Sequence, residues 1–136
     1  MNFKEFKKLV EINTQDAQSK MPTLFTDWQS IILQSIKNLA KEIVIDELLV
    51  IGETEDEKLR FLIDKKKKKL SIKMPIKITD ENSEININEE LIMAIVYDVC
   101  QLLSKDINMK QKFILDRQDV INTFNWNKYI KMEMSK

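Results

Sequence analysis

The chain of 136 residues contains no histidine and only one cysteine, Cys100. The absence of histidine removes the most common general base and the histidine-containing zinc sites. One cysteine can form neither an intrachain disulfide nor a cluster of thiolate ligands, and it favours a reducing, cytoplasmic location. Cys100 lies in a strongly apolar stretch, which is typical of a core thiol and not of an activated nucleophile.

Glycine and proline are also scarce, since the chain contains only Gly52, Pro22 and Pro75. Phosphate-binding loops need two or three closely spaced glycines, so the sequence excludes them. The apolar uncharged stretch Leu91–Tyr97 in the second half of the chain is much shorter than the roughly 20 residues that a membrane span needs. The N-terminus has no apolar signal core, so we expect no export signal and no membrane span.

One segment has a spacing that suggests a metal site. Oxygen-bearing side chains alternate between Asp80 and Asn88, as they do in calcium-binding EF-hand loops. Such a loop would require glycine in place of Ile85 and glutamate in place of Leu91, so the pattern fails. We therefore predict no metal, no cofactor and no catalytic residues. A hydrolase based on two carboxylates is the enzymatic alternative, and it would need two acids in one cleft.

Apolar residues at helical spacing predict helices over residues 3–12, 27–43 and 89–104. At the start of the second helix, Thr26 and Gln29 match a capping box, in which each side chain bonds the other residue's backbone N–H. Residues 112–115 fit a strand or the start of a helix, and Asp116 or Asp119 is expected to cap a last helix that runs through Phe124.

Alternating apolar and polar residues predict strands over 45–51, 58–64 and 69–78, with a short fourth strand at 83–87. The expected fold class is therefore α+β, with residues 1–136 forming a single domain. Its sheet would be a small antiparallel β-meander of three to four strands, with helices packed on one face. Pro75 cannot donate to a neighbouring strand, so a free edge there leaves dimerisation open.

Charge is unevenly distributed along a chain whose net charge is zero. Residues 58–78 carry nine Lys or Arg against one acid, a net charge of +8, whereas residues 1–57 carry −5 and residues 79–108 carry −6. Separated charge of this kind predicts surfaces that bind charged partners. We define the basic patch as the cationic residues of this block: Lys58, Arg60, Lys65, Lys66, Lys67, Lys68, Lys69, Lys73 and Lys77.

The basic patch has three interpretations. Lysines can keep an edge strand soluble without any further role. They can also neutralise the phosphates of a nucleic acid, although arginine, which reads guanine, is nearly absent. The third interpretation is contact with an acidic protein or a membrane surface.

Two further sets of residues are candidate docking sites. The acidic patch, defined here as the acids around the first predicted turn, would attract a basic protein such as a nuclease; its members are Asp46, Glu47, Glu53, Glu55, Asp56 and Glu57. The aromatic anchor comprises Phe124, Trp126 and Tyr129. Aromatic residues often dominate interfaces, and burial against the sheet is the alternative.

These observations predict a non-catalytic protein-binding domain. A toxin-neutralising, immunity-like protein or an adaptor fits best, with a protein partner that is a basic toxin or nuclease. The alternative is a nucleic-acid-binding accessory protein that uses the basic hairpin 58–78.

Overall fold

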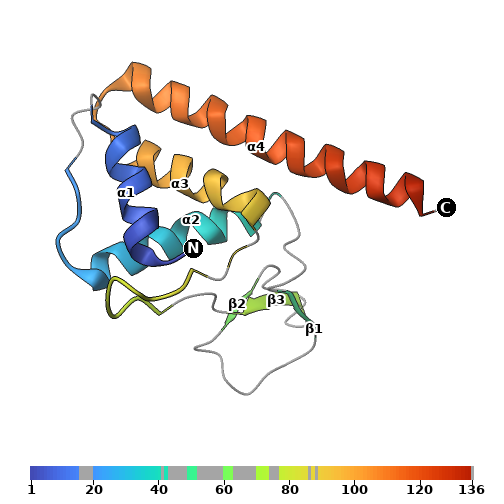
Figure 1. Cartoon of the computed structure of the whole chain (residues 1–136), viewed down its shortest axis with the longest axis horizontal. Coiled ribbons are helices and arrows are strands. Elements are labelled where there is room, and N and C mark those ends of the chain that lie inside the picture. The colour runs from blue at the N-terminus through green and yellow to red at the C-terminus, as the bar shows by residue number, and fades with distance from the viewer. Residues whose placement is uncertain are drawn as a thin grey trace. The chain divides into compact units, whose positions relative to one another are not determined.

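The computed structural model in Figure 1 describes residues 1–15, 20–40, 42, 49–51, 60–62, 70–73, 77–85, 87 and 89–135. Helices dominate this part of the chain, and the strands are three or four residues long. The elements in chain order are α1 (Phe3–Asn13), α2 (Phe25–Ala40), β1 (Leu49–Ile51), β2 (Arg60–Leu62), β3 (Leu70–Lys73), α3 (Glu89–Leu103) and α4 (Ile107–Met134).

The expected α+β class is wrong. The three short strands are ordered β1-β3-β2 and are antiparallel, with Leu49 opposite Ile72 and Phe61 opposite Ile72. A meander would place β2 between its chain neighbours, whereas β3 is central here. The predicted fourth strand at 83–87 is reduced to an isolated bridge between Asn2 and Glu84. The described residues are mainly helical, which overturns the expected class. β1, β2 and β3 lie within the predicted strand ranges 45–51, 58–64 and 69–78, and the other residues of those ranges lie outside the described ones, except Lys77 and Ile78.

The described residues cluster into two compact units that are interleaved along the sequence. Unit 1 comprises Met1–Phe6 and Pro22–Asn88, and unit 2 comprises Lys7–Met21 and Glu89–Lys136. Helix α1 begins in unit 1 and continues in unit 2. Neither unit is one continuous segment of the chain, and the single-domain assignment of residues 1–136 stays a prediction.

In unit 1, aromatic packing fixes the start of α2. The Trp28 ring meets the Phe3 ring edge to face, with centroids 5.5 Å apart, and Phe3 meets Phe25 in the same manner at 5.7 Å. The buried Trp28 indole N–H donates to the carbonyl of Pro22 at 2.9 Å. A buried tryptophan usually has such a partner, because an unpaired N–H is costly away from water.

The capping box predicted at Thr26 and Gln29 is wrong. Helix α2 begins at Phe25, so Thr26 lies within its first turn. The Gln29 side chain instead accepts a hydrogen bond from the backbone N–H of Ile78 at 2.7 Å. This bond joins residues 49 positions apart, which local sequence patterns cannot reveal.

In unit 2, α3 and α4 pack against each other and are joined by the short segment 104–106. Most of α3 is buried, including Cys100, whose thiol donates weakly to the carbonyl of Val10 in α1 at 3.9 Å. The interpretation of Cys100 as a core thiol is confirmed, because its side chain is fully buried.

Helix α4 begins earlier than the sequence predicted. Its N-cap is Asp106, whose carboxylate accepts a hydrogen bond from the Met109 N–H at 3.1 Å. Asp116 and Asp119, the predicted caps, lie well inside the helix. At 28 residues, α4 is about 42 Å long, whereas the 15 residues of α3 span about 22 Å. No helix in the described residues is both long and apolar enough to cross a membrane.

Candidate functional site

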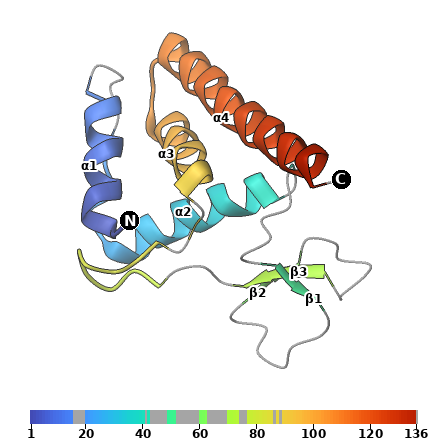
Figure 2. The same cartoon turned by 45° about the vertical axis from the view of Figure 1, so that its right-hand side comes forward.

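The last turns of α4 extend beyond the start of α3 (Figures 1 and 2). Glu90, in the first turn of α3, lines the same pocket as Asn127 of α4. The remaining residues of α4, about two turns, therefore continue past the N-terminus of α3. This overhang leaves large apolar side chains exposed to solvent, namely Ile130, Met132 and Met134.

Two aromatic side chains on this part of α4 stack on one another while remaining exposed. The rings of Trp126 and Tyr129 have centroids 5.8 Å apart and are inclined by 29°. Trp126 is 61% exposed and Tyr129 is 54% exposed. Residues three apart are neighbours on a helix surface, so the backbone itself presents the two rings as a pair. Burial as core residues, the alternative raised from the sequence, is wrong for both rings.

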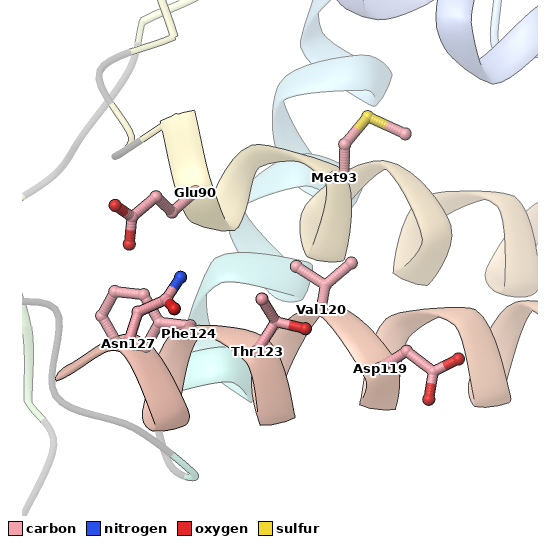
Figure 3. A pocket seen from close by; sticks show the side chains of 7 residues that line it. All are labelled: Glu90, Met93, Asp119, Val120, Thr123, Phe124 and Asn127. Atoms are coloured by element: carbon pink, nitrogen blue, oxygen red, sulfur yellow. The ribbon is translucent and has the colours of Figure 1, made fainter. Parts of the chain in front are cut away.

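A pocket of about 360 Å³ lies between α3 and α4, next to this aromatic pair. Figure 3 shows the residues that line it. Helix α3 contributes two of them and α4 contributes five: Glu90, Met93, Asp119, Val120, Thr123, Phe124 and Asn127. The half-buried Phe124 is thus separated from the other members of the aromatic anchor, because it faces the pocket while they face solvent.

The charged groups of the pocket lie at its two ends, and the Thr123 hydroxyl lies between them (Figure 3). Glu90 and Asn127 lie at one end, beside the Phe124 ring, and Asp119 lies at the other (Figure 3). Met93, Val120 and the Phe124 ring supply the apolar lining between them. Both charged residues of the lining are acids, and Glu90 already interacts with another group of the protein.

Acidic character continues along the same side of α4 to Asp116. Burial raises the pKa of the Tyr97 phenol, and the negative charge of Asp116 raises that pKa further. The basic residues of α4 nearest to the pocket in sequence are Arg117 and Lys128, which directly follows Asn127. The Nε of Arg117 lies 3.5 Å from Oδ1 of Asp98, and both of these side chains are largely buried. The guanidinium is therefore committed to the helix interface and does not neutralise the pocket.

Chemical equipment for catalysis is limited in the part of the chain that the structure describes. Burial raises the pKa of Cys100 to about 12, so the thiol stays protonated and is a poor nucleophile at neutral pH. Within the described ranges, no group of three His, Cys, Asp or Glu side chains could hold a metal ion. Two acids, Glu90 and Asp119, do share the pocket, as the two-carboxylate hydrolase alternative requires, and the Thr123 hydroxyl lies in the same lining.

Most of the charged residues predicted to bind partners lie outside the described residues. This holds for the whole acidic patch, which comprises Asp46, Glu47, Glu53, Glu55, Asp56 and Glu57, and for Lys58 and Lys65–Lys69 of the basic patch. Arg60 and Lys73 are opposite each other in the pairing of β2 with β3. Lys77 is exposed. The two charged patches therefore remain predictions.

Sequence reasoning singled out Phe124, Trp126 and Tyr129 as a candidate docking site, which stays a prediction, and it missed the pocket beside them. The pocket residues of α4 recur at helical spacing, and Glu90 and Met93 of α3 are three apart, so both sets could have been placed on helix faces. The sequence did not show that these two helix faces pack against each other. That packing depends on where α4 begins, and the predicted start was too late in the chain. Comparison of the chain with protein-family models, with curated proteins and with solved structures finds no match.

Proposed function

We propose that this chain is a non-catalytic protein-binding domain whose contact surface includes the outer face of the C-terminal turns of α4. The observation that carries the proposal is the stacked, exposed pair of Trp126 and Tyr129. Exposed aromatic rings expose apolar area to water, a cost that binding a partner removes. Tryptophan and tyrosine are also the residues that most often dominate binding energy at interfaces.

Lys128 and Lys131 lie on the same turns as the pair, and it is the acids of the adjoining pocket that favour a partner with basic character. Trp126 and Ile130 are four residues apart, and Ile130 follows Asn127 by three, so exposed apolar side chains continue directly from the acidic pocket. A basic polypeptide would complement the pocket while covering the apolar residues. Within this class, a toxin-neutralising protein would bind a basic toxin or nuclease, whereas an adaptor would bind another basic protein.

The first experiment identifies the partner and measures its affinity. The full chain, immobilised, captures proteins from a lysate of its host, and each candidate is then purified and titrated by isothermal calorimetry. We expect Trp126→Ala with Tyr129→Ala to weaken binding by at least tenfold, since a central aromatic residue is worth about 2 kcal/mol or more. Ile107→Ala is the matched control, because Ile107 is an exposed apolar residue at the opposite end of the same helix.

Equal affinities for the parent and the double variant would contradict the proposal. A growth assay then separates the two finer assignments. A partner that arrests growth when expressed alone, and no longer does so when co-expressed with this chain, supports toxin neutralisation. A harmless partner supports an adaptor.

A further inference from the structure

The outer face of α4 carries no charged side chain along most of its length. We define the outer stripe as the exposed residues that helical spacing places along this face: Gln111, Ile114, Leu115, Gln118, Asn122, Asn125, Trp126, Tyr129 and Met132. None of them is charged, although 32% of the residues of the chain are charged. A helix face that stays in water usually carries charged residues, whereas the core of an interface is depleted of them. The outer stripe therefore has the composition of an interface.

The order of residues along the outer stripe is nearly symmetric about Asn122. On the N-terminal side lie Ile114 and Leu115, which are 48% and 66% exposed. On the C-terminal side lie the exposed rings of Trp126 and Tyr129. Leu115 and Tyr129 are equally far from Asn122 along the chain, and amide side chains occupy the middle of the stripe. A two-fold dimer requires a surface of this kind, because each patch must be complementary to itself.

We propose that the outer stripe binds the outer stripe of a second copy of the chain, with the two α4 helices antiparallel and the two-fold axis at Asn122. In this register Leu115 lies opposite Tyr129 of the second copy, and Gln118 lies opposite Trp126 of the second copy. An amide side chain both donates and accepts, so the two Asn122 side chains can bond each other across the axis. The Gln118 amide already donates to Oδ1 of Asn122 at 2.9 Å.

The distribution of charge along α4 favours the antiparallel register. In this register every charged residue from Lys110 to Glu133 is level with a neutral or an oppositely charged residue of the second copy, as Asp119 is with Asn125. A parallel pair would place each charged residue level with its own counterpart, so that Lys112 would meet Lys112. Like charges brought together at an interface are costly, and this cost selects the antiparallel pair.

The dimer goes beyond the proposed function and has a consequence for it. The second copy covers the Trp126 and Tyr129 rings, so a protein partner that uses these rings must displace it. Dimerisation and partner binding are then competing equilibria, and the dimer lowers the apparent affinity for the partner by the fraction of chains that it occupies.

Sedimentation of the full chain tests the association. We expect a reversible equilibrium between monomer and dimer as the concentration rises from about 1 µM to about 500 µM. Leu115→Lys should weaken association at least about tenfold, because it brings an unpaired charge into the apolar contact. Ile107→Lys is the matched control. Ile107 is also exposed on α4, but the level position in the second copy lies past Met134, where the helix ends.

Cysteine variants test the register. A disulfide requires Cα atoms within about 7 Å, and Cys100 is buried, so each variant has one accessible thiol. With diamide as the oxidant, we expect Asn122→Cys to crosslink with itself. Leu115→Cys should crosslink with Tyr129→Cys and not with itself, because the two copies of position 115 are about 21 Å apart along the helices.

Three results would overturn the antiparallel dimer: a chain that stays monomeric over the whole concentration range, equal association of the parent and Leu115→Lys, or self-crosslinking of Leu115→Cys that is as fast as mixed crosslinking. A monomer that binds vesicles of anionic lipid would also overturn it, and would assign the outer stripe to a membrane surface.

Failure of the dimer and failure of the proposed function are distinguishable. The dimer predicts that Leu115→Lys binds the protein partner at least as tightly as the parent does, because fewer dimers have to dissociate. Trp126→Ala with Tyr129→Ala should still weaken that binding. A partner that ignores the aromatic substitutions contradicts the proposed function and leaves the sedimentation and crosslinking results unchanged.

Discussion

The ion pair between Asp98 and Arg117 joins α3 to α4 where little water reaches it. The two side chains are 8% and 12% exposed, and Arg117 Nε lies 3.5 Å from Asp98 Oδ1. Charges taken out of water are tolerated only with close partners, so removal of one partner leaves the other poorly compensated. The pair therefore supports the helix interface that forms the pocket.

We predict that Asp98→Asn and Arg117→Met each lower the free energy of unfolding by about 3 kcal/mol. The double variant should cost at least about 1 kcal/mol less than the two single costs combined, because residues in contact are not additive. Urea titrations of the parent and the three variants measure this coupling. Purely additive costs would show that the two charges do not stabilise one another.

Cys100 provides a second test at the scale of single residues. Burial raises the pKa of its thiol to about 12. The native thiol should therefore react with a disulfide reagent at pH 8 far more slowly than the thiol of the urea-unfolded chain. Because the folded pKa is the higher one, this thiol lowers the free energy of unfolding as pH rises from about 9 to about 12, and has no effect below that window. A native reaction as fast as the unfolded one would contradict burial of the thiol.

At the scale of the element, the start of α4 depends on one hydrogen bond. Asp106 has extended backbone angles, with φ −81° and ψ 119°, and its carboxylate accepts from the Met109 N–H. We predict that Asp106→Ala lowers the free energy of unfolding by about 1 kcal/mol, whereas Asp106→Asn keeps the cap and nearly all of that stability. Urea unfolding followed by circular dichroism compares the two. Equal losses in both variants would attribute the effect to charge and not to capping.

Sequence periodicity predicted three of the four helices in the described residues. The predicted ranges 3–12, 27–43 and 89–104 correspond to α1, α2 and α3, and their ends differ by at most three residues. Each of these helices buries one face in a core, which is the condition under which apolar residues recur at helical spacing. The three helix predictions are therefore confirmed, and they concern helices with a single solvent-exposed face.

Helix α4 was largely missed for a physical reason. It buries Phe113 and Ile121 on one side, whereas Leu115, Trp126 and Tyr129 are exposed on another. Apolar residues on both sides cancel the periodic signal by which a helix is recognised. The property that hid the helix is the same property that makes its outer face a candidate for binding.

At the scale of the whole molecule, the interleaving of the two units limits how the chain can be divided. Residues 7–21 belong to the same unit as α3 and α4, and Val10 of this segment accepts the bond from Cys100. We predict that the fragment 89–136 has lower helicity than the same residues in the full chain, and that its Cys100 reacts readily with a thiol reagent. Circular dichroism and the reaction rate test this, and a fragment with the native protection of Cys100 would contradict it.

The uneven charge of the chain gives a second prediction at this scale. The nucleic-acid alternative requires binding that weakens steeply with salt and that disappears when Lys65–Lys69 are replaced by glutamine. For a protein-binding domain we expect the opposite outcome, in which any weak binding of DNA or RNA is the same in parent and variant. Filter binding at several salt concentrations measures this. A large loss in the variant would favour the nucleic-acid assignment.

The chain contains two tryptophans, and they lie in different units. Trp28, in unit 1, is 1% exposed, whereas Trp126, in unit 2, lies in the stacked pair on the surface of α4. Replacing either one by phenylalanine yields a chain with a single tryptophan, whose emission can be excited selectively over that of the two tyrosines, so no dye needs to be attached. Emission from Trp28 would then report on the interior of unit 1, and a soluble quencher would lose access to Trp126 at the moment a partner covers it.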